Sequence, residues 1–197
     1  MISDLDGVLR FFPDARNQEI EVRYGLPSGS LLDCAFKPEL LDLAIRGKVS
    51  DEEWRKNVAS ELARRVPPGA AEAAVREWSD FPGQLEAKNL AFMKKLAESC
   101  DLVLLTNATT RLHSDLERLG IEDDFDLVIN SSEHGAIKPE PAIFGVVKEK
   151  LGLAYTDLVF VDDSASHVKA ARALGMRAHH FSTLTLLRVE MKDLLGY

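Results

Sequence analysis

The sequence has few of the features that mark a secreted, disulfide-bonded or membrane-spanning protein. Its 197 residues include only two cysteines, Cys34 and Cys100. They match no metal-binding or disulfide pattern, so we expect both to be buried as small apolar residues in a reducing compartment. No apolar run is long enough to cross a bilayer, and no charged-then-apolar leader precedes a cleavage site. These absences predict a cytoplasmic protein without a membrane partner.

Positive charge is also scarce. The chain has 24 Lys and Arg against 32 Asp and Glu, which gives a net charge of −8. Nucleic acids and anionic membranes attract basic surfaces, so we expect neither as a partner. A small anionic substrate remains compatible, because a metal ion and a single lysine can reverse the local field. The hydrophobic share of 46% is ordinary for a globular protein, and the length allows one large domain with a smaller insert.

Strand and helix patterns alternate from about residue 85 to the C-terminal region. Short apolar runs predict strands over 102–105, 126–129, 158–161 and, more weakly, 177–181. Amphipathic segments predict helices over 85–98, 110–119, 141–151 and 165–174. Residues 1–5 supply one further strand. This alternation is typical of an α/β fold with a parallel sheet and right-handed crossovers.

Residues 13–81 show a different pattern, with no convincing strand. Helices are predicted over 15–24, 38–46, 51–65 and 70–79. Ser50 and Glu53 form a capping box that starts the third of them. Pro67, Pro82 and Gly83 interrupt the chain near its return. We therefore expect a compact helical insert at 13–81, within a core domain made of residues 1–12 and 82–197.

Two acidic residues stand two positions apart at the end of the first strand. In an extended strand, Asp4 and Asp6 point to the same side. Two such carboxylates repel each other unless a cation lies between them or one is protonated. Oxygen ligands suit magnesium. Taken alone, Asp4-Leu5-Asp6-Gly7 is more typical of a turn.

The ends of the other strands carry polar groups as well. Ligands of open parallel sheets bind beyond the carboxyl ends of the strands. Each group alone has a simpler interpretation, as a helix cap or a solvated surface lysine. Together, and in this order, they predict one site for a metal ion and a phosphoryl group. The residues are Thr106 and Asn107 after the second strand, Lys138 before the helix at 141–151, and Asp162 and Asp163 after the strand at 158–161.

These four segments resemble the motifs of the haloacid dehalogenase-like (HAD) hydrolase superfamily, and the resemblance covers essentially the whole chain. It implies a Rossmann-like, three-layer parallel sheet with a C1-type helical cap inserted after the first strand. The segment Arg46-Gly47-Lys48-Val49-Ser50, leading into Trp54, is similar to the cap of a branch that includes sugar-phosphate phosphatases and the N-terminal phosphatase domain of soluble epoxide hydrolases. The four motifs are Asp4-Leu5-Asp6-Gly7-Val8, Leu104-Leu105-Thr106-Asn107, Gly135-Ala136-Ile137-Lys138-Pro139 and Val161-Asp162-Asp163-Ser164.

The resemblance also implies a role for each residue. Asp4 would be the nucleophile that forms an aspartyl-phosphate, and Asp6 would be the general acid and base. Thr106 and Lys138 would hold the phosphoryl oxygens. Mg²⁺ would be bound by Asp4, the backbone carbonyl of Asp6, and either Asp162 or Asp163, between which the sequence does not choose.

The residue at position 6 separates branches of the superfamily. Dehalogenase members carry an aromatic residue there and ATPase-type members a threonine, whereas an acid is typical of phosphate-ester chemistry. Asp6 therefore favours a magnesium-dependent phosphomonoester hydrolase acting on a small phosphorylated metabolite, such as a sugar phosphate. Two alternatives stay open: a phosphomutase of the same superfamily, and a non-catalytic binding or regulatory protein on this fold. We expect a monomer or a homodimer.

Three positions depart from the family pattern or leave alternatives open. Only three residues precede Asp4, whereas strands usually run to about five or six residues. His167 stands where relatives carry asparagine, and we expect it on the helix surface or beside the metal ligands. Arg10 is either a contact for a second anionic group of the substrate or a surface arginine. Asn107 is a candidate contact for substrate or phosphate.

Overall fold

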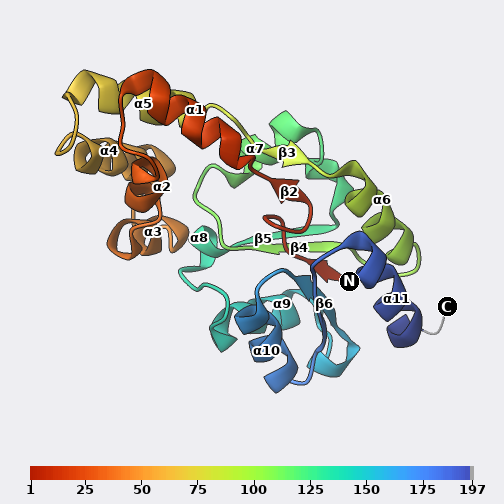
Figure 1. Ribbon diagram of the computed structural model, residues 1–197. Coiled ribbons are helices and arrows are strands. Elements are labelled where there is room, and N and C mark those ends of the chain that lie inside the picture. Colours follow the sequence, from red (N-terminus) through yellow and green to blue (C-terminus); the bar gives the residue numbers. More distant parts are fainter. Residues whose placement is uncertain (196–197) are drawn as a thin grey trace.

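The computed structural model describes residues 1–195, with side chains described to residue 192. Its centre is a parallel sheet of five strands in the order β5-β4-β1-β6-β7 (Figure 1). The α/β fold predicted from the alternation of strands and helices is therefore confirmed. The strands are β1 (Ile2–Ser3), β4 (Val103–Thr106), β5 (Leu127–Asn130), β6 (Val159–Asp162) and β7 (Arg177–His180).

The central strand β1 is short, yet it is paired on both sides. Ile2 and Ser3 lie in register with β4 on one side and with β6 on the other. The pairing continues beyond the strand: Val103 N donates to Met1 O at 2.8 Å, and Asp4 N donates to Val161 O at 2.9 Å. Backbone hydrogen bonds therefore hold the chain up to Asp4, at the carboxyl end of the sheet.

Helices cover both faces of the sheet (Figure 1). The strands alternate their side chains between the two faces, so Leu104 and Val161 belong to one apolar cluster and Leu105 and Phe160 to the other. The first cluster includes residues of α6 (Ala87–Leu96), α7 (Leu112–Leu119) and α11 (Leu184–Leu195). The second includes residues of α9 (Pro141–Leu151) and α10 (Ala165–Ala173). The result is a three-layer core.

The helical insert has an apolar core of its own. Trp54, Val58 and Leu62 are buried there with residues of the neighbouring helices. A two-stranded antiparallel sheet, β2 (Arg10–Phe11) and β3 (Gln84–Leu85), lies where the chain leaves for the insert and returns from it. The exact domain boundaries stay a prediction. The helices are α1 (Asp14–Tyr24), α2 (Ser30–Ala35), α3 (Pro38–Ile45), α4 (Asp51–Leu62) and α5 (Pro68–Ser79).

Several details differ from the sequence-based expectation. Leu85 was expected in a helix, but it pairs with Arg10 in β3, and α6 begins only at Ala87. Cys100 is exposed after the end of α6, so the prediction that both cysteines are buried was wrong for it. The Ser50 cap is confirmed, because Glu53 N donates to Ser50 Oγ at 3.2 Å. The short elements α2, α8 (Ser131–His134), η1 (Glu122–Asp124) and η2 (Tyr155–Asp157), and helix α11, were not predicted.

Within the part of the chain that the structure describes, no helix combines the length and apolar character needed to cross a membrane.

Candidate active site

Lys138 is the centre of a buried charge cluster at the carboxyl end of the sheet. Its side chain is 1% exposed. Its Nζ lies 2.8 Å from Asp4 Oδ1 and 2.7 Å from Asp162 Oδ2, and it donates to Leu105 O at 2.9 Å. The alternative of a solvated surface lysine was therefore wrong. Three segments that are far apart in the sequence meet at this ammonium group.

Asn107 positions the loop that carries Lys138. Its side-chain amide donates to Lys138 O at 2.9 Å, and its Oδ1 accepts from Lys138 N at 2.8 Å. This reciprocal pair ties the loop between α8 and α9 to the end of β4. Both polar groups of the Asn107 side chain are thus bound to the backbone of Lys138. The predicted contact of Asn107 with a substrate stays a prediction.

The two buried carboxylates differ in their electrostatic environment. Burial raises the pKa of Asp4 to about 7, because loss of hydration outweighs the attraction of the Lys138 ammonium. Burial acts in the same direction on Asp162, but the hydrogen bond with His167 and the charge of Lys138 together hold the pKa of Asp162 well below its usual value. Each carboxylate also accepts one backbone hydrogen bond: Leu5 N donates to Asp4 Oδ1 and Ser164 N donates to Asp162 Oδ1, each at 2.7 Å.

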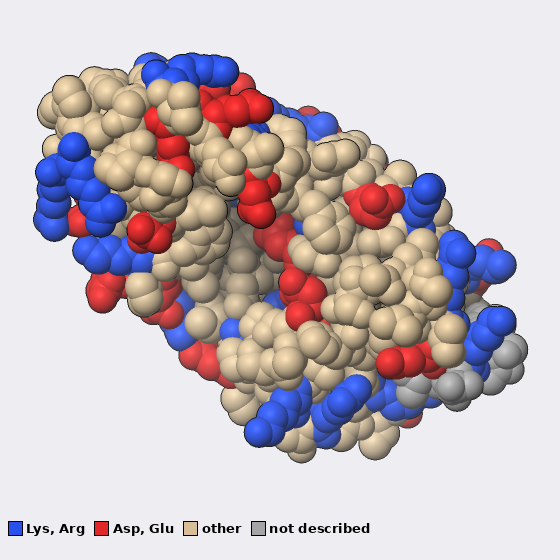
Figure 2. Space-filling model, viewed as in Figure 1, with Lys and Arg blue, Asp and Glu red and all other residues tan. Residues whose placement is uncertain are grey.

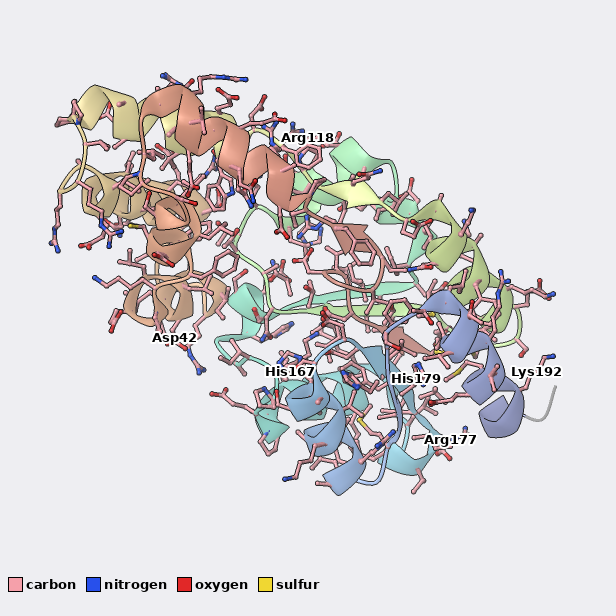
Figure 3. The ribbon with its side chains drawn as sticks, viewed as in Figure 1. Asp42, Arg118, His167, Arg177, His179 and Lys192 are labelled. Carbon is pink, nitrogen blue, oxygen red and sulfur yellow. The ribbon has the colours of Figure 1, made fainter. Side chains whose placement is uncertain are left out.

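His167 completes a set of potential metal ligands. One ligand atom from each of Asp4, Asp162 and His167 lies within 4.8 Å of the others. His167 comes from the first turn of α10 (Figure 3), and its Nδ1 lies 3.0 and 3.1 Å from the two Asp162 oxygens. The two carboxylates of this set are oxygen donors, which suit a hard divalent cation. The charge of such a cation would favour the ionised form of Asp4. The expectation that His167 lies beside the metal ligands agrees with these contacts.

Asp163 points elsewhere than Asp162. Asp162 is fully buried beside Lys138, whereas Asp163 is partly exposed and its carboxylate packs against Gly7. Gly7 has a φ of 79°, and a Cβ at this position would overlap the Asp163 carboxylate. Burial raises the pKa of Asp163. Of the two candidates, Asp162 is the one that lies with Asp4 and Lys138.

Asp6 lies next to this cluster and is held by Arg10. Arg10 Nε and Nη2 donate to the two Asp6 oxygens at 2.6 and 3.0 Å, while the Asp6 side chain remains 44% exposed. Arg10 itself is buried and also contacts Asp115 at 3.4 Å and Pro82 O at 3.3 Å. The surface-arginine alternative was therefore wrong. Arg10 thus holds the Asp6 carboxylate, and its predicted contact with a second anionic group of the substrate stays a prediction.

Thr106 is buried at the end of β4, where it pairs with Asn130 of β5. It lies one residue before Asn107 and one residue after Leu105, whose carbonyl accepts the Lys138 hydrogen bond. The structure thus brings Asp4, Thr106, Lys138 and Asp162 to one edge of the sheet, with Asp6 and Asp163 beside them.

A cavity of about 300 Å³ lies between the insert and the core. Figure 2 shows the hollow on this face, with acidic side chains along its rim. Asp6 and Asn107 line it from the core, and Trp54 and Trp78 line it from the insert. Of these four residues, the sequence pointed to Asp6 and Asn107 as site residues but not to Trp54 or Trp78; Trp78 carries no local signal beyond its place in an amphipathic helix.

The insert is fastened to the core on one side of this cavity. Arg46 donates to the two Glu140 oxygens at 3.0 and 2.6 Å. Thr109 Oγ1 donates to Asp51 Oδ1 at 2.8 Å, and Ser131 Oγ donates to the carbonyl of Ile45 at 2.6 Å. These contacts join residues 58 to 94 positions apart, so no local sequence pattern could have revealed them.

Comparisons with known proteins agree with this geometry. Residues 2–175 match the family model described as haloacid dehalogenase-like hydrolase. Phosphatase MT3486 of Mycobacterium tuberculosis is 29% identical over 91% of this chain and 85% of its own length. Acyl-CoA dehydrogenase family member 10 of Mus musculus is 25% identical over 100% of this chain, which spans only 19% of that protein.

Among solved structures, a HAD family enzyme from Bacteroides thetaiotaomicron, an Asp-to-Ala mutant in complex with magnesium and inorganic phosphate, superposes with a TM-score of 0.72. It is 24% identical, and the match covers 94% of this chain and 96% of that one. At this identity the likeness establishes the fold. Together with the family match over most of the chain, it shows that the protein is a member of the haloacid dehalogenase-like hydrolases.

Proposed function

We propose that the protein is a magnesium-dependent phosphomonoester hydrolase that acts through an aspartyl-phosphate on Asp4. The observation that carries the proposal is the buried Lys138 ammonium, 2.8 Å from Asp4 and 2.7 Å from Asp162, with the partly exposed Asp6 beside it. A single cation between two carboxylates leaves net negative charge at the sheet edge, which favours binding of a divalent ion. The phosphatase name of one relative, and the magnesium and phosphate in the structure of another, support the same reaction.

In the first step, the Asp4 carboxylate would attack phosphorus. Its Oδ1 already accepts hydrogen bonds from Leu5 N and lies against Lys138, so Oδ2 is the oxygen assigned to the attack. The new bond to phosphorus forms as the bond to the leaving oxygen breaks. Lys138 and Thr106 would stabilise the charge on the phosphoryl oxygens.

Asp6 would act as the proton carrier in both steps. It gives a proton to the leaving oxygen, and it then takes one from the water that hydrolyses the aspartyl-phosphate and regenerates Asp4. The two hydrogen bonds from Arg10 hold the Asp6 carboxylate at the boundary between the buried cluster and the cavity. That position suits a group that must reach the leaving alcohol.

Asp4, Asp162 and the backbone carbonyl of Asp6 would hold Mg²⁺, which when bound offsets the repulsion between the nucleophile and the phosphate. His167 would orient Asp162, and Asp163 would lie beside the site. Residues 13–81 would serve as a cap over a core made of residues 1–12 and 82–197. The cytoplasmic location and the monomeric or homodimeric state stay predictions.

The experiment is hydrolysis of an aryl phosphate by the native chain and by Asp4→Asn, each with Mg²⁺ and with a chelator. We expect phosphate release that needs Mg²⁺ and falls by roughly 10³-fold or more in Asp4→Asn, because a carboxamide cannot form the acyl-phosphate. Asp157→Asn is the matched control, because Asp157 is an exposed acid in η2, before β6, and it does not line the cavity. Full activity in Asp4→Asn would refute the assignment.

The phosphomutase alternative is tested with the same preparation. A hydrolase releases one free phosphate for each substrate consumed, whereas a mutase returns the phosphoryl group to the product and releases little. The alternative of a non-catalytic protein predicts no turnover, with or without Mg²⁺. The complete set of Asp4, Asp6, Thr106, Lys138 and Asp162 at one sheet edge supports the enzyme.

A further inference from the structure

Together with aliphatic and polar residues, several aromatic side chains line the cavity beside Asp6. They are arranged as two edge-to-face pairs, with ring centroids 5.7 Å apart for Trp54 and Trp78 and 6.2 Å apart for Phe12 and Phe81. Phe36 of the α2–α3 turn also lines the cavity and is 58% exposed, and Phe12 is 48% exposed. Aliphatic residues of α2 and α3 complete the surface. So much exposed aromatic area in a cavity is characteristic of a binding site for apolar groups.

The arginines in the same wall are all paired with carboxylates. Arg10 is paired with Asp6 and Asp115, and Arg111 Nε donates to Asp115 Oδ1 at 2.8 Å. Arg55 is ion-paired with Asp51. Among the described residues that line the cavity, every arginine therefore has a carboxylate partner. These arginines therefore offer no unpaired guanidinium group to bind a second phosphate or a carboxylate of the ligand.

One buried hydrogen-bond donor in the wall has no protein partner. The indole N–H of Trp54 is buried and makes no hydrogen bond to any described residue. A buried donor of this kind gains most from a single acceptor on the ligand or from a water molecule. This single N–H group does not provide the several directed hydrogen bonds that a polyhydroxylated ring requires.

We propose that the substrate is the monophosphate of an apolar alcohol, with an aromatic, alicyclic or branched hydrocarbon body and few hydroxyl groups. This inference rests on the proposed phosphatase function and names its substrate class. The phosphate binds at the Asp4–Lys138 cluster, Asp6 protonates the leaving oxygen, and the hydrocarbon body lies in the aromatic cavity. A sugar phosphate of equal size should be disfavoured, because several of its hydroxyl groups would face the apolar part of this wall.

The size of the cavity fits this class. An apolar cavity of about 150 Å³ holds one benzene ring. The cavity here, at about 300 Å³, accommodates a body of about one to two rings.

The direct test compares two substrates of the same shape, cyclohexylmethyl phosphate and glucose 6-phosphate. Both place a six-membered ring one CH₂ group from the phosphate ester, and they differ chiefly in hydroxyl groups. We expect kcat/KM for cyclohexylmethyl phosphate to be on the order of 100-fold higher, because site discrimination by polarity reaches this size. Phosphoglycolate, which adds a carboxylate to a small ester, should also be a poor substrate.

Binding can be followed separately from turnover. The chain has two tryptophans, Trp54 and Trp78, and both line the cavity. In Asp4→Asn with Mg²⁺, titration of cyclohexylmethyl phosphate should therefore change the intrinsic fluorescence at concentrations at least tenfold lower than glucose 6-phosphate does.

A pair of surface variants locates the effect. Phe36→Ser should raise KM for cyclohexylmethyl phosphate several-fold and leave kcat/KM for methyl phosphate unchanged. Val22→Ser removes an apolar side chain that is 82% exposed on α1 and does not line the cavity, so it should change neither value. Both side chains are largely exposed, so both variants should fold.

The outcomes separate the two proposals. If glucose 6-phosphate or phosphoglycolate is hydrolysed as well as cyclohexylmethyl phosphate, the phosphatase proposal stands and the apolar substrate class is overturned. If no ester is hydrolysed, the phosphatase proposal fails, and the fluorescence titration still decides what the cavity binds. Equal affinity for the two ring compounds in that titration would also overturn the substrate class.

Discussion

At the scale of single residues, the site depends on how one lysine shares its charge between two aspartates. Lys138 is almost completely buried, and its pKa is raised because Asp4 and Asp162 outweigh the effect of desolvation. The hydrogen bond with His167 helps to keep the pKa of Asp162 low. Asp4 has no such partner, and its pKa rises to about 7. In the metal-free protein, Asp4, the proposed nucleophile, is therefore the carboxyl group of this cluster that titrates near neutral pH.

This asymmetry predicts that Mg²⁺ binding depends on pH. Binding to an ionised Asp4 displaces a proton below pH 7, so the apparent affinity should fall by up to about tenfold for each pH unit below about 7 and change little above it. Isothermal titration calorimetry in buffers with different ionisation enthalpies measures both the affinity and the proton released. No released proton at pH 6 would contradict the pKa of Asp4.

The same shift gives a signed effect on stability. The pKa of Asp4 rises from 3.8 to about 7 on folding, so the native state holds this proton more tightly than the unfolded chain does. The stabilisation is fully present below pH 3.8 and is lost as the pH rises to about 7. The lowered pKa of Asp162 has the opposite effect on stability, because stability is lost as Asp162 becomes protonated, but this happens only below about pH 3.8. Relative to Asp4→Asn, the metal-free native chain should therefore lose stability between pH 4 and pH 7 in urea titrations.

His167 is predicted to act through Asp162. Its Nδ1 lies within 3.1 Å of both Asp162 oxygens. Removal of such an outer partner typically weakens metal binding by about 10- to 100-fold. His167→Ala should therefore weaken Mg²⁺ binding by about tenfold in calorimetry, while His167→Asn, which retains a donor, should stay within a few-fold of the native chain. His134→Ala, at the end of α8, is the control, and equal affinities in all variants would exclude this role.

At the scale of secondary-structure elements, the turn between α3 and α4 places the insert against the core. Gly47 has a φ of 65°, and a Cβ there would overlap the backbone carbonyl of Ser132 in α8. Only glycine satisfies both the left-handed conformation and this close approach. The segment Arg46-Gly47-Lys48-Val49-Ser50, quoted above for its resemblance to a cap, is therefore also a point of contact between insert and core.

Gly47→Ala is predicted to disturb this contact. The left-handed backbone alone costs roughly 1–2 kcal/mol for a residue with a Cβ. Gly25→Ala is a matched control, because Gly25 has a φ of 66° and no atom near the added Cβ. Both variants should lower Tm by a few degrees, but Gly47→Ala should also raise KM several-fold. Equal KM values for the two variants would show that the Ser132 contact has no part in substrate binding.

At the scale of the whole molecule, the insert and the core enclose the cavity, and ion pairs help to hold them together. Arg46 pairs with Glu140 at 2.6 Å, and Arg118 pairs with Asp80 at 3.6 Å. The Arg46–Glu140 pair is partly exposed. The Arg46 hydrogen bond holds the pKa of Glu140 below its usual value, so both groups stay ionised at neutral pH. The Arg46–Glu140 ion pair therefore joins the insert to the core near the cavity, and added salt should weaken it.

Removing this fastening should weaken substrate binding modestly. Partly exposed ion pairs contribute up to about 1 kcal/mol, so Arg46→Ala should raise KM by no more than about fivefold. Glu140→Ala should do the same, and the double variant should be no worse than either single one. Lys56→Ala, which breaks a pair with Glu52 on the exposed surface of α4, should leave KM unchanged. Additive effects of Arg46→Ala and Glu140→Ala would show that the pair is not coupled.

Much of the core was predictable because its signals are local. The strand predicted at 102–105 is β4 (Val103–Thr106), and the strand predicted at 158–161 is β6 (Val159–Asp162). The ends shift by one residue because Thr106 and Asp162 are polar yet still pair with neighbouring strands. The predicted site residues Asp4, Lys138 and Asp162 meet because parallel strands bring their carboxyl ends to one edge.

Other features depend on contacts that no local pattern encodes. The burial of Arg10 could not be predicted, because its partners Asp6 and Asp115 lie 4 and 105 positions away, and only the fold brings both within reach. The short β1 strand is held by β4 and β6 together, which a count of its residues could not reveal. The proposed substrate class also depends on tertiary contacts. The sequence suggested a sugar phosphate, whereas the aromatic residues that line the cavity led us to propose an apolar alcohol.

Motifs and hydrophobic periodicity were enough to predict the family and the alternation of strands and helices, and to single out the groups that we propose to react, because both are properties of neighbouring residues. Only the folded chain shows that Asp162 rather than Asp163 lies with Lys138 and Asp4, that Arg10 holds Asp6, and that aromatic rings line the cavity beside Asp6. The physical reason is that charge pairing and burial depend on distances between segments, and only the folded chain sets those distances.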